Sequence, residues 1–231
     1  MLALITNDDG IDAEGLAALE QLASHLFDEV WTVAPAQQAS EIGHRVTTKG
    51  AIRVEEQGYN RYAIHGTPAD CTRLALSRIL PAKPDWILSG INHGGNLGRH
   101  DFVISGTVAA VREAAFAGIP GVAVSHFIRR GLPLDWDAAS SRALSALELV
   151  MGEQAETGEF WCINLPHPEN EETKPQVVFC EQEHKPLIVE YSEVEPGHWQ
   201  YSGDYHSRPR TPGSDVDVCF RGDIAVSRVS V

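Results

Sequence analysis

The first ten residues, MLALITNDDG, constrain the fold more than any other stretch of the chain. Residues 2–5 are apolar and too few for a buried helix, so they predict a strand that is covered on both faces. This strand is followed by Asp8 and Asp9, and Gly10 lets the chain turn directly after them. Because ligands of open α/β sheets gather where parallel strands end, we expect both carboxylates in a functional crevice. The alternative is that one of them only caps the next helix.

Strands and helices alternate along the first half of the chain. Leucines at helical spacing predict an amphipathic helix over 14–27, and weak alternation over 46–64 predicts short strands or a hairpin. The segment GTPADC predicts a helix start, with Thr67 as N-cap, Pro68 at the first helical position and Asp70 in the first turn. The remaining expected elements are strands over 29–34, 85–89, 121–125 and 160–165, and helices over 68–80, 105–117 and 136–151. Up to residue 126 this alternation predicts an α/β fold with a doubly wound, mostly parallel sheet.

The chain changes character after residue 126. Further strands are expected over 176–180, 187–191 and 223–231, separated by polar loops and by no long helix. These strands predict a hairpin-rich extension that adds to the sheet or reaches to a partner. We therefore expect one α/β domain over 1–231, in which 1–126 carries the site and 127–231 completes the sheet and supports oligomerisation.

Charge and cysteine content narrow the class of protein. The chain holds 18 Lys plus Arg against 32 Asp plus Glu, and the formal charge of −14 opposes binding to nucleic-acid polymers or anionic membranes. The four cysteines are scattered without a C-x-x-C pair, as expected of reduced, mostly buried thiols. The first residues lack a basic signal-peptide region and no apolar run approaches ~18 residues, so we expect a soluble cytoplasmic protein.

Oxygen side chains follow three of the expected strands. Asp8 and Asp9 follow the first strand, Ser40 lies in the loop after the strand at 29–34, and Asn92 lies in a glycine-rich loop over 90–98. Carboxylate, hydroxyl and amide oxygens are hard ligands that suit Mg²⁺, Mn²⁺ or Ca²⁺. With only two charges around it, such an ion stays electrophilic enough to bind a phosphate oxygen and to activate a water.

The helix expected over 105–117 begins with Ser105, Gly106 and Thr107. Free N–H groups and the positive end of the helix dipole attract an anion to a helix N-terminus, so this start is suited to phosphate. The alternative is that Ser-Gly-Thr is only a good helix cap. Together with a divalent ion, an anion site here predicts the hydrolysis of phosphoesters.

Four sequence blocks occur in a specific order, namely TNDDG, VAP followed by a loop serine, GTPADC, and SGINHGGNLG with SGTVAAVREA. In these blocks the chain resembles the SurE family, the survival-protein-E nucleotidases, over about residues 1–126. The resemblance implies a Rossmann-like fold and hydrolysis of nucleoside monophosphates to nucleoside and phosphate. It implies one divalent metal ion per subunit, Mg²⁺ or Mn²⁺, held by Asp8, Asp9, Ser40 and Asn92. It also implies phosphate binding by Asn96, Ser105, Gly106 and Thr107, and catalytic roles for Asp8, Asp9 and Asn96.

The resemblance also bears on assembly. Members of the family commonly form dimers by exchanging a C-terminal hairpin or helix, and these dimers sometimes pair into tetramers. We therefore expect a homodimer or homotetramer in which residues 170–215 are the exchanging segment.

The loop around Ser40 departs from the family pattern. Relatives usually precede this serine with an arginine-bearing stretch and follow it with glycine, whereas this chain has AQQA at 36–39 and Glu41. This departure leaves open a nucleotide-binding regulator that keeps the fold and the metal without turnover. An enzyme with an aspartyl nucleophile is the weaker alternative, because the spaced D-x-D arrangement is missing. His44 and His93 lie in candidate site loops, so each is a candidate general acid or base.

Overall fold

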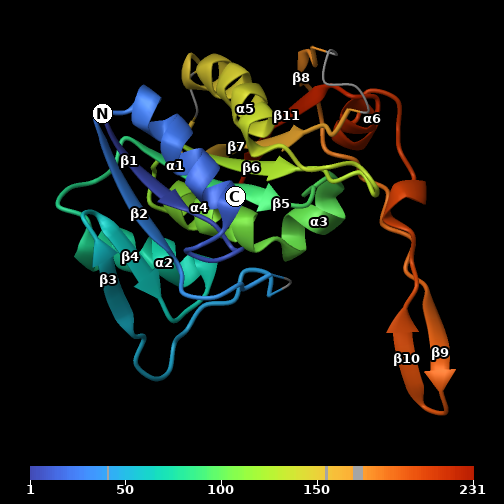
Figure 1. Ribbon diagram of the computed structural model, residues 1–231, viewed down its shortest axis with the longest axis horizontal. Coiled ribbons are helices and arrows are strands. Elements are labelled where there is room, and N and C mark those ends of the chain that lie inside the picture. Colours follow the sequence, from blue (N-terminus) through green and yellow to red (C-terminus); the bar gives the residue numbers. More distant parts are fainter. Residues whose placement is uncertain (41, 154–155, 169–173) are drawn as a thin grey trace.

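The computed structural model describes residues 1–40, 42–153, 156–168 and 174–231. Its centre is a β-sheet (Figure 1). The nine strands that these residues contribute are, in spatial order, β3 (Val54–Gly58), β4 (Arg61–Ile64), β2 (Glu29–Pro35), β1 (Leu2–Thr6), β5 (Trp86–His93), β6 (Gly121–His126), β7 (Glu159–Leu165), β11 (Ile224–Ser230) and β8 (Val177–Phe179). Neighbours from β4 to β7 run parallel, while β3 is antiparallel to β4 and β11 is antiparallel to β7. The predicted doubly wound, mostly parallel α/β fold is confirmed.

Helices cover both faces of this sheet. On one face lie α1 (Glu14–Leu26) and α5 (Trp136–Met151), and on the other lie α2 (Pro68–Leu74) and α4 (Gly106–Phe116) (Figure 1). The apolar residues of α1 recur at helical spacing and face the core, which explains the amphipathic pattern of its sequence. Strand β1 is buried on both faces between these layers, so its sequence is an apolar run rather than an alternation.

Strand β1 lies at the point where the order of the strands reverses. After β1 the chain passes through α1 to β2 on one side, and it returns later to β5 on the other side. Connections therefore leave the carboxyl ends of β1 and β5 in opposite directions, which opens a crevice between them. Asp8 and Asp9 directly follow β1, and Asn92 lies at the end of β5. The topology thus brings three of the predicted site residues to one crevice.

The glycine-rich segment is more ordered than its sequence suggests. β5 continues to His93, so Asn92 belongs to a strand and not to a loop, and its pairing with β6 is interrupted between Ser89 and Asn92. A short helix, α3 (Gly98–Ile104), follows and was not predicted. The glycines of this segment favoured a loop, and pairing with β6 extends the strand instead.

The predicted start of α2 is confirmed in detail. The Thr67 hydroxyl accepts a hydrogen bond from the Asp70 N–H at 3.1 Å, and Asp70 Oδ2 accepts one from the Thr67 N–H at 3.0 Å. This reciprocal capping box leads into Pro68 at the first helical position. The predicted helix to residue 80 is partly wrong, since the α-helix ends at Leu74 and a π-helical turn occupies Ala75–Ile79.

The C-terminal part differs most from the prediction. The strand expected over 187–191 is wrong, and β9 (Tyr191–Glu195) pairs instead with β10 (His198–Tyr201) in a hairpin that projects from the body (Figure 1). The turn between these strands contains Pro196 and Gly197, which favour a reversal of the chain there. A short helix, α6 (Asp215–Phe220), was also missed, although Ser214 caps it.

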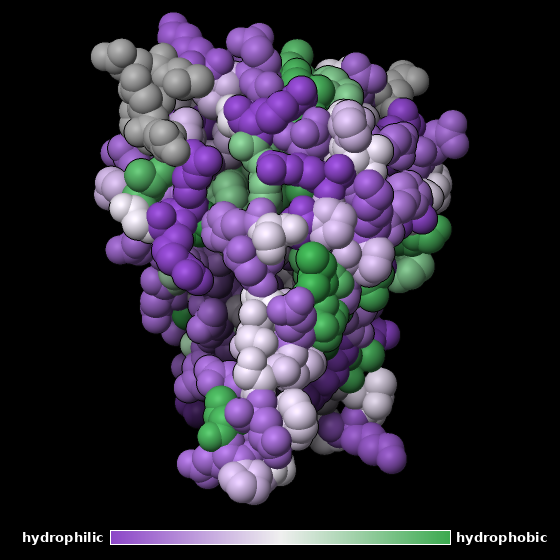
Figure 2. Space-filling model, turned by 90° about the vertical axis from the view of Figure 1, so that its right-hand side faces the viewer, coloured by the Kyte–Doolittle hydropathy of each residue, from purple (hydrophilic) through white to green (hydrophobic). Residues whose placement is uncertain are grey.

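One face of the molecule is mostly hydrophilic, and most of the cysteine thiols are buried. On the face shown in Figure 2 hydrophilic residues dominate, and apolar residues occur in small separate groups. Of the helices in the described residues, none is both long and apolar enough to cross a membrane. All four cysteines are free thiols, and burial raises the pKa of Cys71, Cys162 and Cys219. The prediction that most of the thiols are buried is confirmed.

Candidate active site

A closed turn after β1 fixes the two candidate carboxylates. The side chain of Asn7 donates to the Gly10 carbonyl at 2.8 Å and accepts from the Gly10 N–H at 3.2 Å. Gly10 has a φ of 106°, a conformation that side-chain-bearing residues rarely adopt. Asn7 is 1% exposed and was not among the predicted site residues. Asn side chains commonly bond to nearby backbone in turns, and an Asn shortly before a turn-forming Gly is the signal by which this role is recognisable in the sequence.

Asp8 points from this turn to the start of α4. Thr107 Oγ1 donates to Asp8 Oδ1 at 2.6 Å, and a Cβ on Gly106 would lie 2.8 Å from Asp8 Oδ2, so glycine is required for this approach. The carboxyl group is 4% exposed. Burial raises the pKa of Asp8 to about 6 and the nearby charge of Asp9 adds to the rise, while the hydrogen bond from Thr107 opposes it. One predicted metal ligand therefore contacts the predicted phosphate-binding helix start.

Asp9 faces the end of β5. Its Oδ2 accepts a hydrogen bond of 3.0 Å from the backbone N–H of His93, the residue after Asn92. The Asn92 Nδ2 donates to the Gly94 carbonyl at 2.7 Å, an orientation that leaves the amide oxygen as a possible ligand. Asp9 also lines an open pocket of about 230 Å³. The carboxylate is thus more accessible than that of Asp8.

The loop that carries Ser40 closes over the same turn. The Ala39 N–H donates to the Asp8 carbonyl oxygen at 2.8 Å, which joins the loop to the turn one residue before Ser40. Gln38 Nε2 donates to Ser40 Oγ at 3.0 Å. A Cβ on Gly10 would lie 3.2 Å from the backbone of Gln37, so the loop and the turn are in close contact. Glu41, the residue that departs from the family pattern, lies outside the described residues.

The donor set at this crevice fits a hard divalent cation. The segments that carry Ser40 and Asn92 each bond to the turn of Asp8 and Asp9, through the Ala39 and His93 N–H groups, and carboxylate, hydroxyl and amide oxygens suit Mg²⁺ or Mn²⁺. The raised pKa of Asp8 reflects a carboxylate that lacks compensation for its burial. The part of the chain that is described holds no group of three or more His, Cys, Asp or Glu suited to a metal. An ion here would therefore depend on the serine and asparagine oxygens as well.

The contacts of the α4 start support its interpretation as a helix cap, and phosphate binding there stays a prediction. Ser105 is the N-cap, and its hydroxyl accepts from the Val108 N–H at 3.1 Å. The hydroxyl of Thr107 is engaged by Asp8. Phosphate binding at this position would therefore use the backbone N–H groups at the positive end of the helix.

Asn96 lies farther along the sheet than the other predicted residues. Its Nδ2 donates to Ser125 Oγ at 2.8 Å, and its backbone N–H donates to Asn164 Oδ1 at 2.8 Å. Asn164 Nδ2 in turn donates to the Asn96 carbonyl at 3.2 Å. These contacts hold Asn96 against β6 and β7 and not against Asp8. Its roles in catalysis and phosphate binding stay predictions.

The two histidine candidates differ in their surroundings. His93 lines the pocket beside Asp9. His44 is engaged elsewhere, because its Nε2 lies 2.7 Å from Glu113 Oε1 and its Nδ1 lies 3.1 Å from Arg112 Nη1. Both partners lie on α4 beyond its first turn, so these contacts direct the His44 ring to the side of that helix.

A C-terminal segment braces the glycine-rich loop. Arg208 is 3% exposed and donates to Asp101 Oδ2 at 2.7 Å and to the Leu97 carbonyl at 2.8 Å. The Tyr205 hydroxyl donates to the same Asp101 oxygen at 2.9 Å. Asp215 Oδ2 accepts from the Gly98 N–H at 2.7 Å. This brace was not predicted, because the bonded residues are about a hundred positions apart in the chain and no local pattern marks them.

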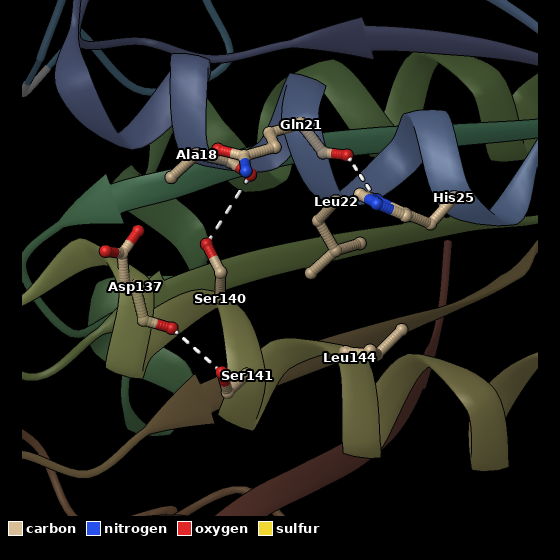
Figure 3. A pocket seen from close by; sticks show the side chains of 8 residues that line it. All are labelled: Ala18, Gln21, Leu22, His25, Asp137, Ser140, Ser141 and Leu144. Atoms are coloured by element: carbon tan, nitrogen blue, oxygen red, sulfur yellow. Dashed lines mark hydrogen bonds between the residues drawn. The ribbon is translucent and has the colours of Figure 1, made fainter.

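A second hollow, of about 220 Å³, lies between α1 and α5 (Figure 3). Its polar side chains bond to helix carbonyls, with Ser141 Oγ donating to Asp137 at 3.0 Å and His25 Nδ1 lying 2.8 Å from the Gln21 carbonyl oxygen. These bonds satisfy the groups within their own helices. The hollow is a groove between packed helices, and its lining residues come from α1 and α5.

Comparison with known proteins identifies the family. The family model described as "Survival protein SurE" matches residues 3–187. A protein of Synechocystis sp. is 46% identical over 228 residues, covering 99% of each chain. The 5'-nucleotidase SurE of Allorhizobium ampelinum is 40% identical over 171 residues, covering 73% of this chain and 66% of its own. The crystal structure of SurE protein from Aquifex aeolicus aligns with a TM-score of 0.85 at 28% identity, covering 100% of this chain and 93% of that chain. The resemblance predicted from four sequence blocks is confirmed, and the chain belongs to the SurE family.

Proposed function

We propose that this protein is a divalent-metal-dependent phosphomonoesterase that hydrolyses nucleoside monophosphates to nucleoside and phosphate. The contact between Thr107 and Asp8 carries the proposal, because it joins an anion-binding helix start to a carboxylate suited to a cation. Hydrolysis of a phosphate ester uses both an anion-binding site for the phosphate and a cation that neutralises its charge. The substrate class is supported by the relatives that are named 5'-nucleotidase SurE.

In this proposal one Mg²⁺ or Mn²⁺ ion per subunit is held by Asp8, Asp9, Ser40 and Asn92. When bound, the ion would neutralise charge on the phosphate and make a water a better nucleophile. The local positive charge is needed because the chain as a whole carries −14 and repels an anionic substrate.

The residues of the chain have separate roles in this reaction. Backbone N–H groups at Gly106 and Thr107 bind the phosphate oxygens together with Ser105, and Asn96 contributes from its place against β6 and β7. Thr107 fixes the Asp8 carboxylate through its 2.6 Å hydrogen bond. Asp9, the more accessible acid, orients the water that attacks phosphorus. As the new P–O bond forms, the water loses a proton and the ester P–O bond breaks, and the leaving oxygen takes up a proton to depart as a hydroxyl of the nucleoside.

We also propose a cytoplasmic homodimer or homotetramer. The described part of the predicted exchanging segment includes the β9–β10 hairpin, which projects from the body (Figure 1). On this hairpin Tyr191 is 58% exposed and Trp199 is 62% exposed. Large aromatic side chains in such a position are suited to contact with another subunit.

Phosphate release from a panel of nucleoside monophosphates tests the proposed function. Purified protein is incubated with each nucleotide after EDTA treatment and again after addition of Mg²⁺, Mn²⁺ or Zn²⁺. We expect release with Mg²⁺ or Mn²⁺ and none with EDTA. Nucleotide binding without release would instead identify the regulator that the altered Ser40 loop leaves open. Recovery with Zn²⁺ alone would contradict the oxygen-ligand site.

A further inference from the structure

The pocket of about 230 Å³ beside Asp9 continues the proposed metal site away from the phosphate helix. Its walls are formed by Asp9, Glu14, Gln38, His93 and Trp136. Gln38 lies two residues before Ser40 and His93 follows Asn92, so this pocket opens directly next to the proposed ligands. A substrate whose phosphate lies between the start of α4 and the proposed metal site would extend its remaining part into this space.

One wall of the pocket is an indole ring held in a fixed position. Trp136 Nε1 donates to Glu14 Oε2 at 2.9 Å. A Cβ on Gly15 would lie 2.8 Å from Trp136 Cη2, so the ring packs directly on the first turn of α1 and only glycine admits it. The ring of His126 meets the indole edge to face, with centroids 6.2 Å apart. These three contacts hold the indole in place before a ligand arrives, which lowers the entropy cost of binding.

The chemistry of the walls selects the ligand. An indole face attracts a flat aromatic ring, and stacking of this kind is insensitive to which nucleobase is bound. Glu14 uses Oε2 for the indole N–H, so its other oxygen can accept hydrogen bonds from hydroxyl or amine donors. The carboxylates of Asp9 and Glu14 disfavour a second anionic group in this pocket. A neutral ligand with an aromatic ring and hydroxyl groups satisfies all three conditions.

We infer that this pocket binds the nucleoside portion of the substrate, with the base stacked on Trp136 and Glu14 accepting from the sugar hydroxyls. The inference rests on the proposed function and adds the residues that distinguish a nucleotide from other phosphate esters. It assigns a specificity role to the start of α5, which lies outside the segment 1–126 in which the site was expected.

Two kinds of measurement on Trp136→Leu and Trp136→Phe test this inference. The first is the ratio of kcat/KM for AMP to kcat/KM for glycerol 1-phosphate, an ester without a base. We expect Trp136→Leu to lower this ratio ~10-fold and Trp136→Phe to lower it less than ~3-fold, since stacking survives on a phenyl ring. The second is calorimetric binding of adenosine, which we expect to weaken by similar factors.

Trp31→Leu is the matched control. Trp31 also donates its Nε1 to a glutamate, Glu29, at 2.7 Å, but it lies on β2 and packs on Tyr62. This variant is expected to keep both the ratio and adenosine binding. If Trp136→Leu does not fold, Glu14→Ala removes the acceptor and frees the indole, and it is expected to lower the ratio at least ~3-fold.

The outcomes separate the inference from the proposed function. An unchanged ratio in Trp136→Leu, with hydrolysis intact, would overturn the nucleoside pocket and leave the phosphatase in place. Adenosine binding that depends on Trp136, in a protein that releases no phosphate from either ester, would support the pocket and overturn the proposed function. Equal losses on AMP and glycerol 1-phosphate would show that Trp136 only supports the fold, which contradicts the inference.

Discussion

The Thr107 hydroxyl donates a 2.6 Å hydrogen bond to Oδ1 of Asp8, across 99 residues of sequence. The bond connects the end of β1 to the start of α4, two elements that were predicted separately as a metal-binding turn and a phosphate-binding helix start. A change at Thr107 therefore affects the proposed cation site and the proposed anion site together.

Replacing Thr107 by valine keeps the shape of the side chain and removes its hydroxyl. We expect kcat/KM for AMP to fall at least ~10-fold, because Asp8 loses the donor that orients it, while stability falls by only ~1 to 3 kcal/mol. Thr107→Ser retains the donor and is expected to stay within ~3-fold of the wild type. Steady-state kinetics and urea unfolding on the same preparations measure both effects. A loss of stability with unchanged kinetics would reduce Thr107 to a packing residue of the helix start.

The raised pKa of Asp8 predicts how stability depends on pH. This pKa is about 6 in the folded protein against 3.8 for the free side chain, so the folded state disfavours the charged form. The free energy of unfolding of the metal-free protein should therefore fall as pH rises from about 4 through 6, by up to ~3 kcal/mol. Asp8→Asn should remove this dependence, as measured by urea unfolding across the pH range.

A bound cation should reverse this effect of pH. Because the ion and the proton compete for Asp8, we expect Mg²⁺ or Mn²⁺ to raise Tm strongly at about pH 8 and weakly at about pH 5. Thermal melts with and without metal provide the comparison. Equal shifts at both pH values would remove Asp8 from the cation site.

The strands and helices of the first half were predictable because local patterns and packing agree there. Periodicity identified α1 and α5, and the reciprocal bonds of Thr67 and Asp70 follow a capping pattern visible in the sequence. The π-helical turn at Ala75–Ile79 and the hairpin at 191–201 were missed. In both, the outcome depends on hydrogen-bond partners that periodicity does not reveal.

Three of the predicted site residues lie together in the fold. Asp8, Asp9 and Asn92 were predicted from their places after apolar strands, and the order of β2, β1 and β5 explains why they meet. Asn96 was grouped with them through the resemblance, and the structure holds it beside Ser125 and Asn164.

Contacts between distant segments escaped the sequence analysis. Trp136 reaches Glu14 from the start of α5, and Arg208 reaches Asp101 from the C-terminal segment. Neither pair follows a local spacing rule.

Arg208→Met tests the C-terminal brace. The substitution leaves the carboxylate of Asp101, which is 6% exposed, without its guanidinium partner, and breaking a buried ion pair in this way costs ~3 to 5 kcal/mol. We expect a lower Tm and reduced turnover, because Arg208 also holds the Leu97 carbonyl next to Asn96. Adding Asp101→Asn should restore part of the stability by removing the unpaired charge.

Arg210→Met is the control for that experiment. Arg210 is exposed and lies over the ring of Phe220, so its loss should change Tm little. Similar effects of the two arginine substitutions would contradict a specific brace by Arg208.

The rate of phosphate release from AMP by Asp9→Asn, compared with the wild type and with Asp12→Asn, tests the central claim most directly. Asp12 lies three residues after Asp9 with 86% of its side chain exposed, so it controls for the loss of one negative charge nearby. With Mg²⁺ or Mn²⁺ present, we expect Asp9→Asn to lose at least ~100-fold in kcat/KM and Asp12→Asn to match the wild type. EDTA should stop release in all three proteins. Wild-type rates in Asp9→Asn, or release that persists in EDTA, would contradict a metal-dependent phosphatase built on this turn.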